Sequence, residues 1–204
     1  MKIYISSNFK KYFKTHIDFT DHYWIKYFES KNHFFRLIPN SIKNLNEVIK
    51  ENKKIDLIIL SGGNDLFGKD RLSKIRLKTE TILIKFSIRH KIPILGVCRG
   101  MQVLNHYFGG KIKKIKGHMK SNHLVKMKTD FFKKAEIKAN SFHNFGISKK
   151  GVSQSFKILG VDKKDNIEMF VHKKYKIIGT MWHPEREKDY SRLNLIIKNL
   201  IAKK

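Results

Sequence analysis

The sequence has little cysteine, little proline and few acidic residues. A single cysteine among 204 residues excludes an intramolecular disulfide and a metal site built from several cysteines. A lone thiol is typical of a reducing compartment, so we expect a cytoplasmic protein. No stretch of about 18 uncharged apolar residues occurs, which predicts no membrane-spanning helix. Residues 1–5 run straight into a polar stretch and lack the apolar core of a signal peptide.

The scarcity of acidic residues leaves a large positive charge. Lys and Arg number 44 against 17 Asp and Glu, which gives a formal net charge of +27. Such an excess is typical of proteins that bind phosphate groups. However, the basic residues are 37 Lys and only 7 Arg, whereas nucleic-acid readout relies on the Arg fork. With 27 Ile, 14 Asn and 3 Ala, the composition indicates AT-rich codon usage instead.

We therefore expect no nucleic-acid partner and no membrane partner. A basic binding module with a degenerate site is the alternative outside the enzymes. A positive surface would also raise the local concentration of a small substrate that carries phosphate groups.

The alternation of apolar runs and helical patterns predicts the fold class. Hydrophobic residues make up 41% of the chain, and no repeat or linker divides it, so we expect a single domain over residues 1–204. Continuous apolar runs at 56–60 and 93–97 are typical of strands buried on both faces. The first half therefore predicts an α/β fold with a mostly parallel, doubly wound sheet flanked by helices. The second half predicts an additional region of short, partly antiparallel strands. The predicted strands are 2–6, 34–38, 56–60, 93–97, 122–128, 135–140, 155–162, 166–172 and 176–181, and the predicted helices are 20–31, 42–49, 71–90, 99–108 and 189–202.

A cysteine between two glycines follows the second buried strand. The run Gly96-Val97-Cys98-Arg99-Gly100 has the form of a nucleophile elbow. A sharp turn from strand to helix leaves no room for side chains two residues to either side, which explains the glycines. The helix N-terminus would stabilise a thiolate, and the backbone N–H of Arg99 would point toward an oxyanion. The alternative is a small buried cysteine packed beside glycines.

A histidine and a glutamate follow the last predicted strand. A thiolate nucleophile needs a base and a group that orients the base. His183 can take and return a proton, and Glu185 can hold the other ring nitrogen. Because sites in such sheets form at the carboxyl ends of strands, Cys98 and His183 are expected to meet. The two motifs together indicate a Cys98–His183–Glu185 triad rather than a structural histidine.

Three separated motifs carry a resemblance to a known family. Residues 61–63 (Ser-Gly-Gly), 96–102 and 183–185 occur in an order and spacing that resemble the class I glutamine amidotransferase-like fold. Amidotransferase domains usually carry Leu after the nucleophile, where this chain has Arg99. That residue and the run Asn-Ser-Phe-His at 140–143 look like the γ-glutamyl hydrolases of the peptidase C26 type. That branch often shows His-His-Gln after Asn-Ser-x, whereas Asn and Phe follow the histidine here.

The resemblance implies an enzyme that cleaves a γ-glutamyl amide through a thioester, without a metal or organic cofactor. Cys98 would be the nucleophile, His183 the general base and then the acid, and Glu185 the residue that orients His183. The backbone N–H groups of Gly63 and Arg99 would form the oxyanion hole. The positions that would contact the substrate are Asn64, Gln102, Ser141, Phe142 and His143.

The resemblance leaves several substrates open. One domain leaves no room for a synthetase module, which favours hydrolysis with release of glutamate over transfer of ammonia. The short chain and its Cys-Arg-Gly run also look similar to hydrolases that act on γ-glutamyl-CDP-amidate in capsule phosphoramidate synthesis, so a nucleotide-linked substrate is the narrower expectation. A γ-glutamyl-γ-aminobutyrate hydrolase-like enzyme is one alternative. A glutaminase subunit that supplies ammonia to a partner is another, and the oligomeric state stays open.

Two histidines precede the strand predicted at 122–128. A zinc site at His118 and His123 would need further ligands at close spacing, and the sequence nearby supplies none. We therefore expect no metal, and we expect these histidines to shape the mouth of the site or to satisfy local backbone groups.

Overall fold

The structure is a computed structural model that describes residues 1–50 and 54–202. Its strands are β1 (Lys2–Ser6), β2 (Asn8–Tyr12), β3 (Thr15–Phe19), β4 (Phe34–Ile38), β5 (Leu57–Leu60), β6 (Ile94–Val97), β7 (Lys113–Lys114), β8 (Ser121–Met127), β9 (Glu136–Ser141), β10 (Phe145–Gly146), β11 (Phe156–Val161), β12 (Ile167–His172) and β13 (Ile177–Thr180). Its helices are α1 (His22–Ser30), α2 (Ile42–Lys50), α3 (Arg71–His90), α4 (Arg99–Tyr107) and α5 (Ser191–Ala202), with short 3-10 turns η1 (Asp130–Phe132) and η2 (Pro184–Arg186).

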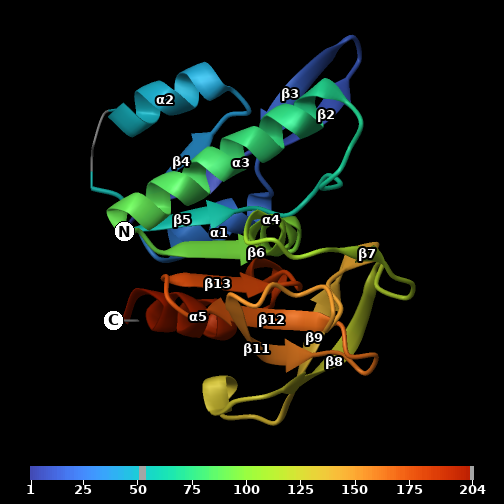
Figure 1. The fold of residues 1–204 in the computed structure, drawn as a ribbon. Helices are drawn as coiled ribbons and strands as arrows, with labels where there is room; N and C mark the ends of the chain where they lie inside the picture. Colours follow the sequence, from blue (N-terminus) through green and yellow to red (C-terminus); the bar gives the residue numbers. More distant parts are fainter. Residues whose placement is uncertain (51–53, 203–204) are drawn as a thin grey trace.

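A nine-stranded sheet forms the centre of the molecule (Figure 1). Its strand order is β4-β1-β5-β6-β13-β12-β11-β8-β9. The pairs from β4 to β13 are parallel, and those from β13 to β9 are antiparallel. The predicted α/β class is therefore confirmed, with the antiparallel region in the second half of the chain where it was expected.

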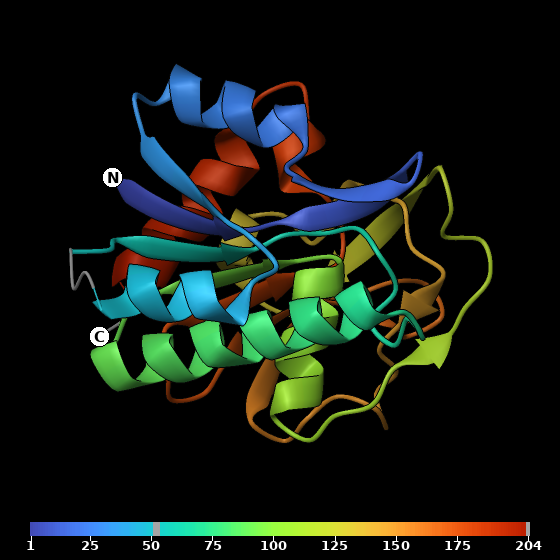
Figure 2. The ribbon, with the colours of Figure 1, turned by 90° about the horizontal axis from the view of Figure 1, so that it is seen from above.

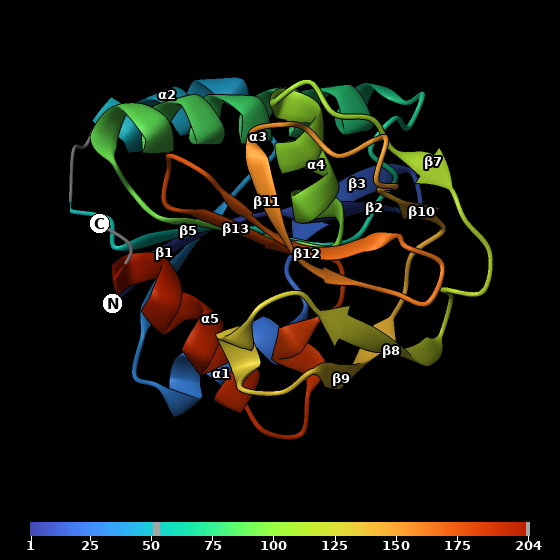
Figure 3. The ribbon, with the colours of Figure 1, turned by 60° about the horizontal axis from the view of Figure 1, so that its bottom comes forward.

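Helices cover both faces of the parallel part of the sheet. Figure 3 shows α2, α3 and α4 on one side of the strands and α1 and α5 on the other. Because successive side chains of a strand point to opposite faces, each central strand contributes to two cores. Ile59 belongs to the hydrophobic cluster that contains Trp24 of α1. Its neighbour Ile58 belongs to the cluster that contains Leu83 of α3. This double burial explains the continuous apolar runs of the sequence.

A hairpin that the sequence analysis did not predict follows β1. Strands β2 and β3 pair with each other in a separate two-stranded sheet and extend beyond the carboxyl end of β1 (Figure 2). The turn between them places Phe13 at φ 51°, a left-handed conformation that usually calls for Gly or Asn. The sequence carries no such turn residue here. Among the described residues, no helix is both long enough and apolar enough to cross a bilayer.

The two glycines of the elbow are required by close packing. A Cβ on Gly100 would lie 2.0 Å from the backbone oxygen of Leu60, in the neighbouring strand β5. A Cβ on Gly96 would lie 2.8 Å from the backbone carbon of Gly100. Real side chains do not approach backbone atoms this closely, so β5, β6 and the start of α4 fit together only without these Cβ atoms.

We predict that Gly100→Ala lowers the free energy of unfolding by about 3 kcal/mol, because β5 and α4 must separate to admit the methyl group. Urea denaturation measures this loss. His106→Ala is the matched control, since His106 is an exposed residue of the same helix. Its effect is expected to stay within about 0.5 kcal/mol. Equal unfolding midpoints for the two variants would contradict the packing argument.

Candidate active site

Cys98 lies at the turn between β6 and α4, in a strained backbone conformation. Its φ is 51° and its ψ is −105°, which is costly for a residue with a side chain. The backbone on both sides maintains this conformation. The Cys98 N–H donates to the carbonyl of Thr180 at 2.8 Å, and the Cys98 carbonyl accepts from the N–H of Gln102 at 3.1 Å. The cysteine is thus placed by β13 on one side and by the first turn of α4 on the other.

The structure brings Cys98, His183 and Glu185 together. His183 Nδ1 lies 2.7 Å from Glu185 Oε1, and both side chains are buried. Burial alone would lower the pKa of His183, but the charge of Glu185, the charge of Cys98 and hydrogen bonds to both raise this pKa to about 10. At neutral pH, His183 is therefore an imidazolium between the side chains of Cys98 and Glu185. An adjacent imidazolium is a group that favours a thiolate nucleophile.

Asn140 of β9 holds the backbone of His183. Its side-chain nitrogen donates to the carbonyl of His183 at 2.8 Å, and its side-chain oxygen accepts from the His183 N–H at 2.9 Å. This pair of bonds joins the antiparallel half of the sheet to the segment that follows β13. The sequence analysis placed this residue on a strand, but it gave no signal for this contact.

Arg76 of α3 organises the loop that follows β5. Its guanidinium donates to the carbonyl oxygens of Ser61, Gly62 and Gly63 at 3.0, 2.9 and 3.1 Å. The peptide group is planar and trans, so a Gly62 carbonyl that points at Arg76 turns the Gly63 N–H the opposite way. Gly63 and Cys98 line the same cavity. The loop geometry is thus compatible with the predicted oxyanion donor.

A buried carboxylate joins Arg76 to the residue that follows the nucleophile. Glu80 lies 3.1 Å from Arg76 Nε and also contacts the guanidinium of Arg99. All three side chains are buried. Burial, together with the nearby Arg99 charge, lowers the pKa of Arg76 to about 10, so Arg76 stays charged at neutral pH. The sequence analysis missed Arg76 and Glu80. Their signal was a pair of opposite charges one turn apart on the apolar face of the helix at 71–90.

The predicted substrate-contacting residues divide into two groups. Asn64, Gln102, Phe142 and His143 line a cavity of about 360 Å³ together with Cys98 and His183. The amide of Asn64 is engaged with Arg76 and with the main chain of Phe9, and Gln102 donates to the carbonyl of Phe145. Ser141 is fully buried instead, and its hydroxyl donates to the carbonyl of His118 at 2.7 Å.

His143 lines this cavity and carries an unprotonated ring nitrogen. Burial and the neighbouring His118 lower the pKa of His143 to about 3, so the ring is neutral at physiological pH. Its Nδ1 lies 2.9 Å from the carbonyl of Phe145 and must therefore carry the proton. In the described part of the chain, Nε2 of His143 has no hydrogen-bond partner. Nε2 is thus a buried hydrogen-bond acceptor on a residue that lines the cavity.

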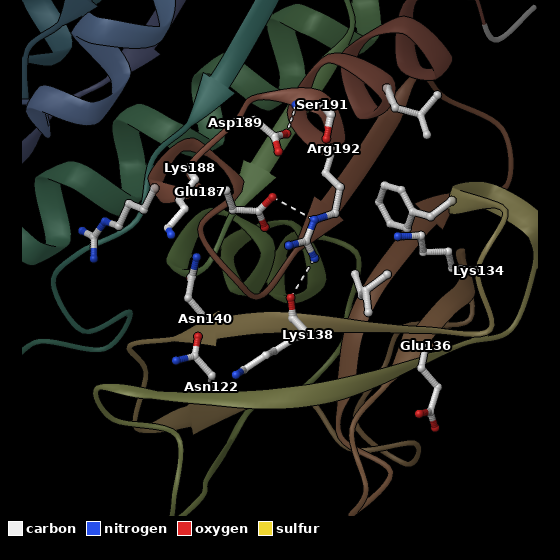
Figure 4. Close-up of a pocket in the computed structure, with 14 residues that line it drawn as sticks. Asn122, Lys134, Glu136, Lys138, Asn140, Glu187, Lys188, Asp189, Ser191 and Arg192 are labelled. Atoms are coloured by element: carbon white, nitrogen blue, oxygen red, sulfur yellow. Dashed lines mark hydrogen bonds and ion pairs between the residues drawn. The ribbon is translucent and has the colours of Figure 1, made fainter.

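A larger cavity of about 730 Å³ adjoins the site (Figure 4). Arg186 connects the larger cavity to the one that contains Cys98, because it lines both. Its guanidinium lies 4.8 Å from the ring centre of Phe142, which lines the smaller cavity. Lys134, Lys138 and Lys188 add positive charge to the larger cavity, and Phe132, Ile137 and Leu195 form apolar parts of its wall. Arg192, which also lines it, is paired with Glu187 at 2.8 Å.

Comparison with known proteins identifies the family of this chain. The family model described as "Glutamine amidotransferase class-I" matches residues 16–202. A γ-glutamyl-CDP-amidate hydrolase from Campylobacter jejuni is 40% identical over 144 residues, 70% of this chain and 68% of that protein. One component of a glutamine-hydrolysing GMP synthase from Methanococcus aeolicus is 31% identical over 74% of each chain. A solved structure from Thermotoga maritima, a glutamine amidotransferase, superposes with a TM-score of 0.69 at 17% identity and covers 99% of this chain and 98% of that one.

The protein belongs to the class I glutamine amidotransferase family. The resemblance inferred from the three sequence motifs is thereby confirmed. The structural similarity, at 17% identity, shows the shared fold alone.

We predict that Glu80→Gln lowers the free energy of unfolding by about 3–5 kcal/mol, because it leaves two arginines buried without a counter-charge. The matched control is Glu47→Gln. Glu47 pairs with Lys50 at 2.9 Å, but both side chains are more than half exposed, at 63% and 70%. Loss of an exposed pair is expected to cost about 0–1 kcal/mol. Comparable losses for the two variants in urea denaturation would show that the cluster is not an essential ionic contact.

We predict that iodoacetamide labels Cys98 at pH 7 up to about 30-fold faster in the natural protein than in His183→Gln. The reason is that an unperturbed thiol is only about 3% ionised at this pH, whereas an imidazolium partner stabilises the thiolate. Mass spectrometry of the alkylated cysteine follows the rate. His106→Gln, in the helix that starts after Cys98, should label like the natural protein. Equal rates in His183→Gln and the natural protein would refute the ion pair.

Proposed function

We propose that the protein hydrolyses a γ-glutamyl amide and releases glutamate. The observation that carries this proposal is the contact of Cys98 with His183 and of His183 with Glu185, in a cavity at the carboxyl ends of β6 and β13. A thiolate, a proton carrier and a carboxylate that orients it are the groups that acyl transfer by cysteine requires. Membership in the glutamine amidotransferase family and the 40% identity to a γ-glutamyl-CDP-amidate hydrolase support the same chemistry.

In the first half of the reaction, the Cys98 thiolate attacks the γ-carbonyl carbon. The carbonyl oxygen becomes an oxyanion, for which the N–H groups of Gly63 and Arg99 are the proposed donors. Loss of one such donor typically costs roughly 2.7–4 kcal/mol of transition-state stabilisation. His183, protonated beforehand, gives its proton to the leaving nitrogen as the C–N bond breaks. The amine departs, and the glutamyl group stays bound as a thioester.

In the second half, His183 is neutral and acts as a base. It takes a proton from a water molecule, whose oxygen attacks the thioester carbon. The C–S bond breaks, glutamate leaves, and the Cys98 thiolate and the His183 imidazolium are restored. Glu185 keeps Nδ1–H of the ring fixed throughout, so Nε2 handles the proton in both halves.

The α-amino group of the glutamyl part is proposed to bind at His143. A substrate ammonium is a hydrogen-bond donor, and His143, which lines the same cavity as Cys98, carries a hydrogen-bond acceptor at Nε2. A neutral ring is required for this contact, and the low pKa of His143 provides it. Phe142 and Gln102 complete the proposed contacts to the glutamyl chain. Ser141 is proposed to act indirectly, through its hydrogen bond to the carbonyl of His118.

For the leaving group, we propose the cytidine diphosphoramidate of γ-glutamyl-CDP-amidate, the compound named in the Campylobacter relative. The larger cavity beside the site supports this choice. Its lysines, Lys134, Lys138 and Lys188, supply ammonium groups suited to phosphate oxygens, and its apolar wall can pack against a base. Capsule phosphoramidate synthesis is the process in which such a substrate occurs, and that assignment is part of the same proposal.

We predict that glutamate release from γ-glutamyl-CDP-amidate exceeds that from glutamine and from γ-glutamyl-γ-aminobutyrate by about tenfold or more in kcat/KM, because only the first places phosphates among the lysines. A coupled glutamate assay measures all three. Cys98→Ala should abolish release from each substrate. A preference for glutamine would point to a glutaminase subunit, and a preference for the γ-aminobutyrate compound to that branch of hydrolases. Release that survives Cys98→Ala would end the thioester mechanism.

A further inference from the structure

A group of metal-ligand side chains lies behind the proposed substrate-binding segment. His118 precedes β8, His123 lies on β8, and Glu168 lies on β12. One ligand atom from each falls within 4.8 Å of the others. Glu168 lies far from the two histidines in the sequence. The fold brings it close to them, because only β11 separates β12 from β8 in the sheet. This is the further ligand that the sequence near the two histidines lacked.

The polar atoms of this group have lone pairs but few partners. Glu168 is completely buried, and in the described part of the chain neither of its carboxylate oxygens has a hydrogen-bond partner. The same holds for both ring nitrogens of His123 within the described residues. Buried polar groups are nearly always satisfied by protein, by water or by an ion. Nε2 of His123 and Oε2 of Glu168 are within ion-pair distance of each other, at 3.4 Å. Nδ1 of His123 and Oε1 of Glu168 remain without a close partner among the described residues, and these buried atoms point to a ligand.

The hydrogen bonds of His118 direct a lone pair into the same group. Its Nε2 lies 3.1 Å from Asp162 Oδ2, so Nε2 carries the proton and Nδ1 is unprotonated. The Ser141 hydroxyl lies 3.3 Å from Nδ1, but it donates to the main-chain carbonyl of His118 instead, at 2.7 Å. Nδ1 thus keeps its lone pair, 4.0 Å from Glu168 Oε1. Metal-binding histidines typically show this arrangement, with the second ring nitrogen held by a carboxylate.

The distances approach those that a first-row divalent ion requires. Zinc bonds of about 2.0–2.1 Å at tetrahedral angles separate ligand atoms by about 3.4 Å. Nε2 of His123 lies 3.4 Å from Glu168 Oε2, and Nδ1 of His118 lies 4.0 Å from Glu168 Oε1. The ligand atoms of all three residues lie within 4.8 Å of one another, so the side chains would move inward by roughly an ångström to close on an ion. Two imidazoles and one carboxylate form a donor set that zinc accepts, with a fourth position left for water.

We propose that His118, His123 and Glu168 bind a divalent zinc-type ion, with Asp162 as the carboxylate that orients His118. The ion would join β8, β12 and the turn before β8. The main-chain carbonyl of His118 accepts hydrogen bonds from Ser141 Oγ and from the His143 N–H, at 2.7 and 3.1 Å. The site would therefore fix the segment that is proposed to recognise the glutamyl group, without taking part in the reaction itself.

The test is a zinc titration of tag-free full-length protein that carries Cys98→Ala, because a reactive thiolate would itself bind zinc. After treatment with a chelator, isothermal titration calorimetry should show saturable binding of one Zn²⁺ per chain. The melting temperature should rise with the free Zn²⁺ concentration, since the unfolded chain has no assembled site. Absence of saturable binding would overturn the proposal.

Three variants in the same background locate the ion. Glu168→Gln keeps the shape of the side chain and should weaken zinc binding by about tenfold or more. His123→Asn should do the same, and because the His123 side chain is 17% exposed it decides the result if Glu168→Gln does not fold. His16→Asn, on the exposed hairpin strand β3, is the matched control and should bind like its parent. Unchanged affinity in His123→Asn would place the ion elsewhere and refute the site.

Neither readout depends on turnover. The zinc proposal therefore fails or stands separately from the proposed hydrolysis.

Discussion

The candidate active site depends on one buried ionic contact, that of Glu80 with Arg76 and Arg99. Two guanidinium groups inside a protein need an anion, and here a single carboxylate serves both. Arg76 shapes the loop that contains Gly63, and Arg99 follows the nucleophile. The two proposed oxyanion donors, Gly63 and Arg99, lie far apart in the chain, yet both are connected to Glu80. Gly63 is connected through Arg76, and Arg99 through its own side chain. The ionic cluster thus links the stability of α3 to the geometry in which Cys98 would react.

Much of the fold could be predicted because the parallel sheet leaves a strong pattern. Strands buried on both faces read as continuous apolar runs, and the helix at 71–90 has the predicted bounds. The elbow at Cys98 could be found from its glycines, whose Cβ atoms would collide with backbone. The contact of Cys98 with His183 followed from a general rule, because β6 and β13 are parallel neighbours whose carboxyl ends lie side by side. The chemical roles of these residues stay predictions.

Other features left only a weak local signal or none. The β2–β3 hairpin turns at Phe13 in a conformation that sequence patterns assign to Gly or Asn. Arg76 and Glu80 look like surface residues until their helix face is seen to be buried. Asn140 and Glu168 matter only through the register of antiparallel strands, which pairs segments that the sequence separates widely. Long-range pairing of this kind depends on the packing of the whole sheet, not on the propensity of any one segment.

The clamp between Asn140 and His183 makes the chain unevenly tolerant of changes in length. The connection between β8 and β9 contains the buried Phe132, but the side chains at 133–135 are exposed, and residues added there would enlarge a surface loop. One residue inserted within β9 would be different, because alternate residues of a strand face opposite sides. The Asn140 side chain would then point to the opposite face of the sheet, and the backbone of His183 would lose both of its hydrogen bonds to Asn140. The candidate site is thus expected to tolerate a longer loop after Phe132 but not an extra residue within β9.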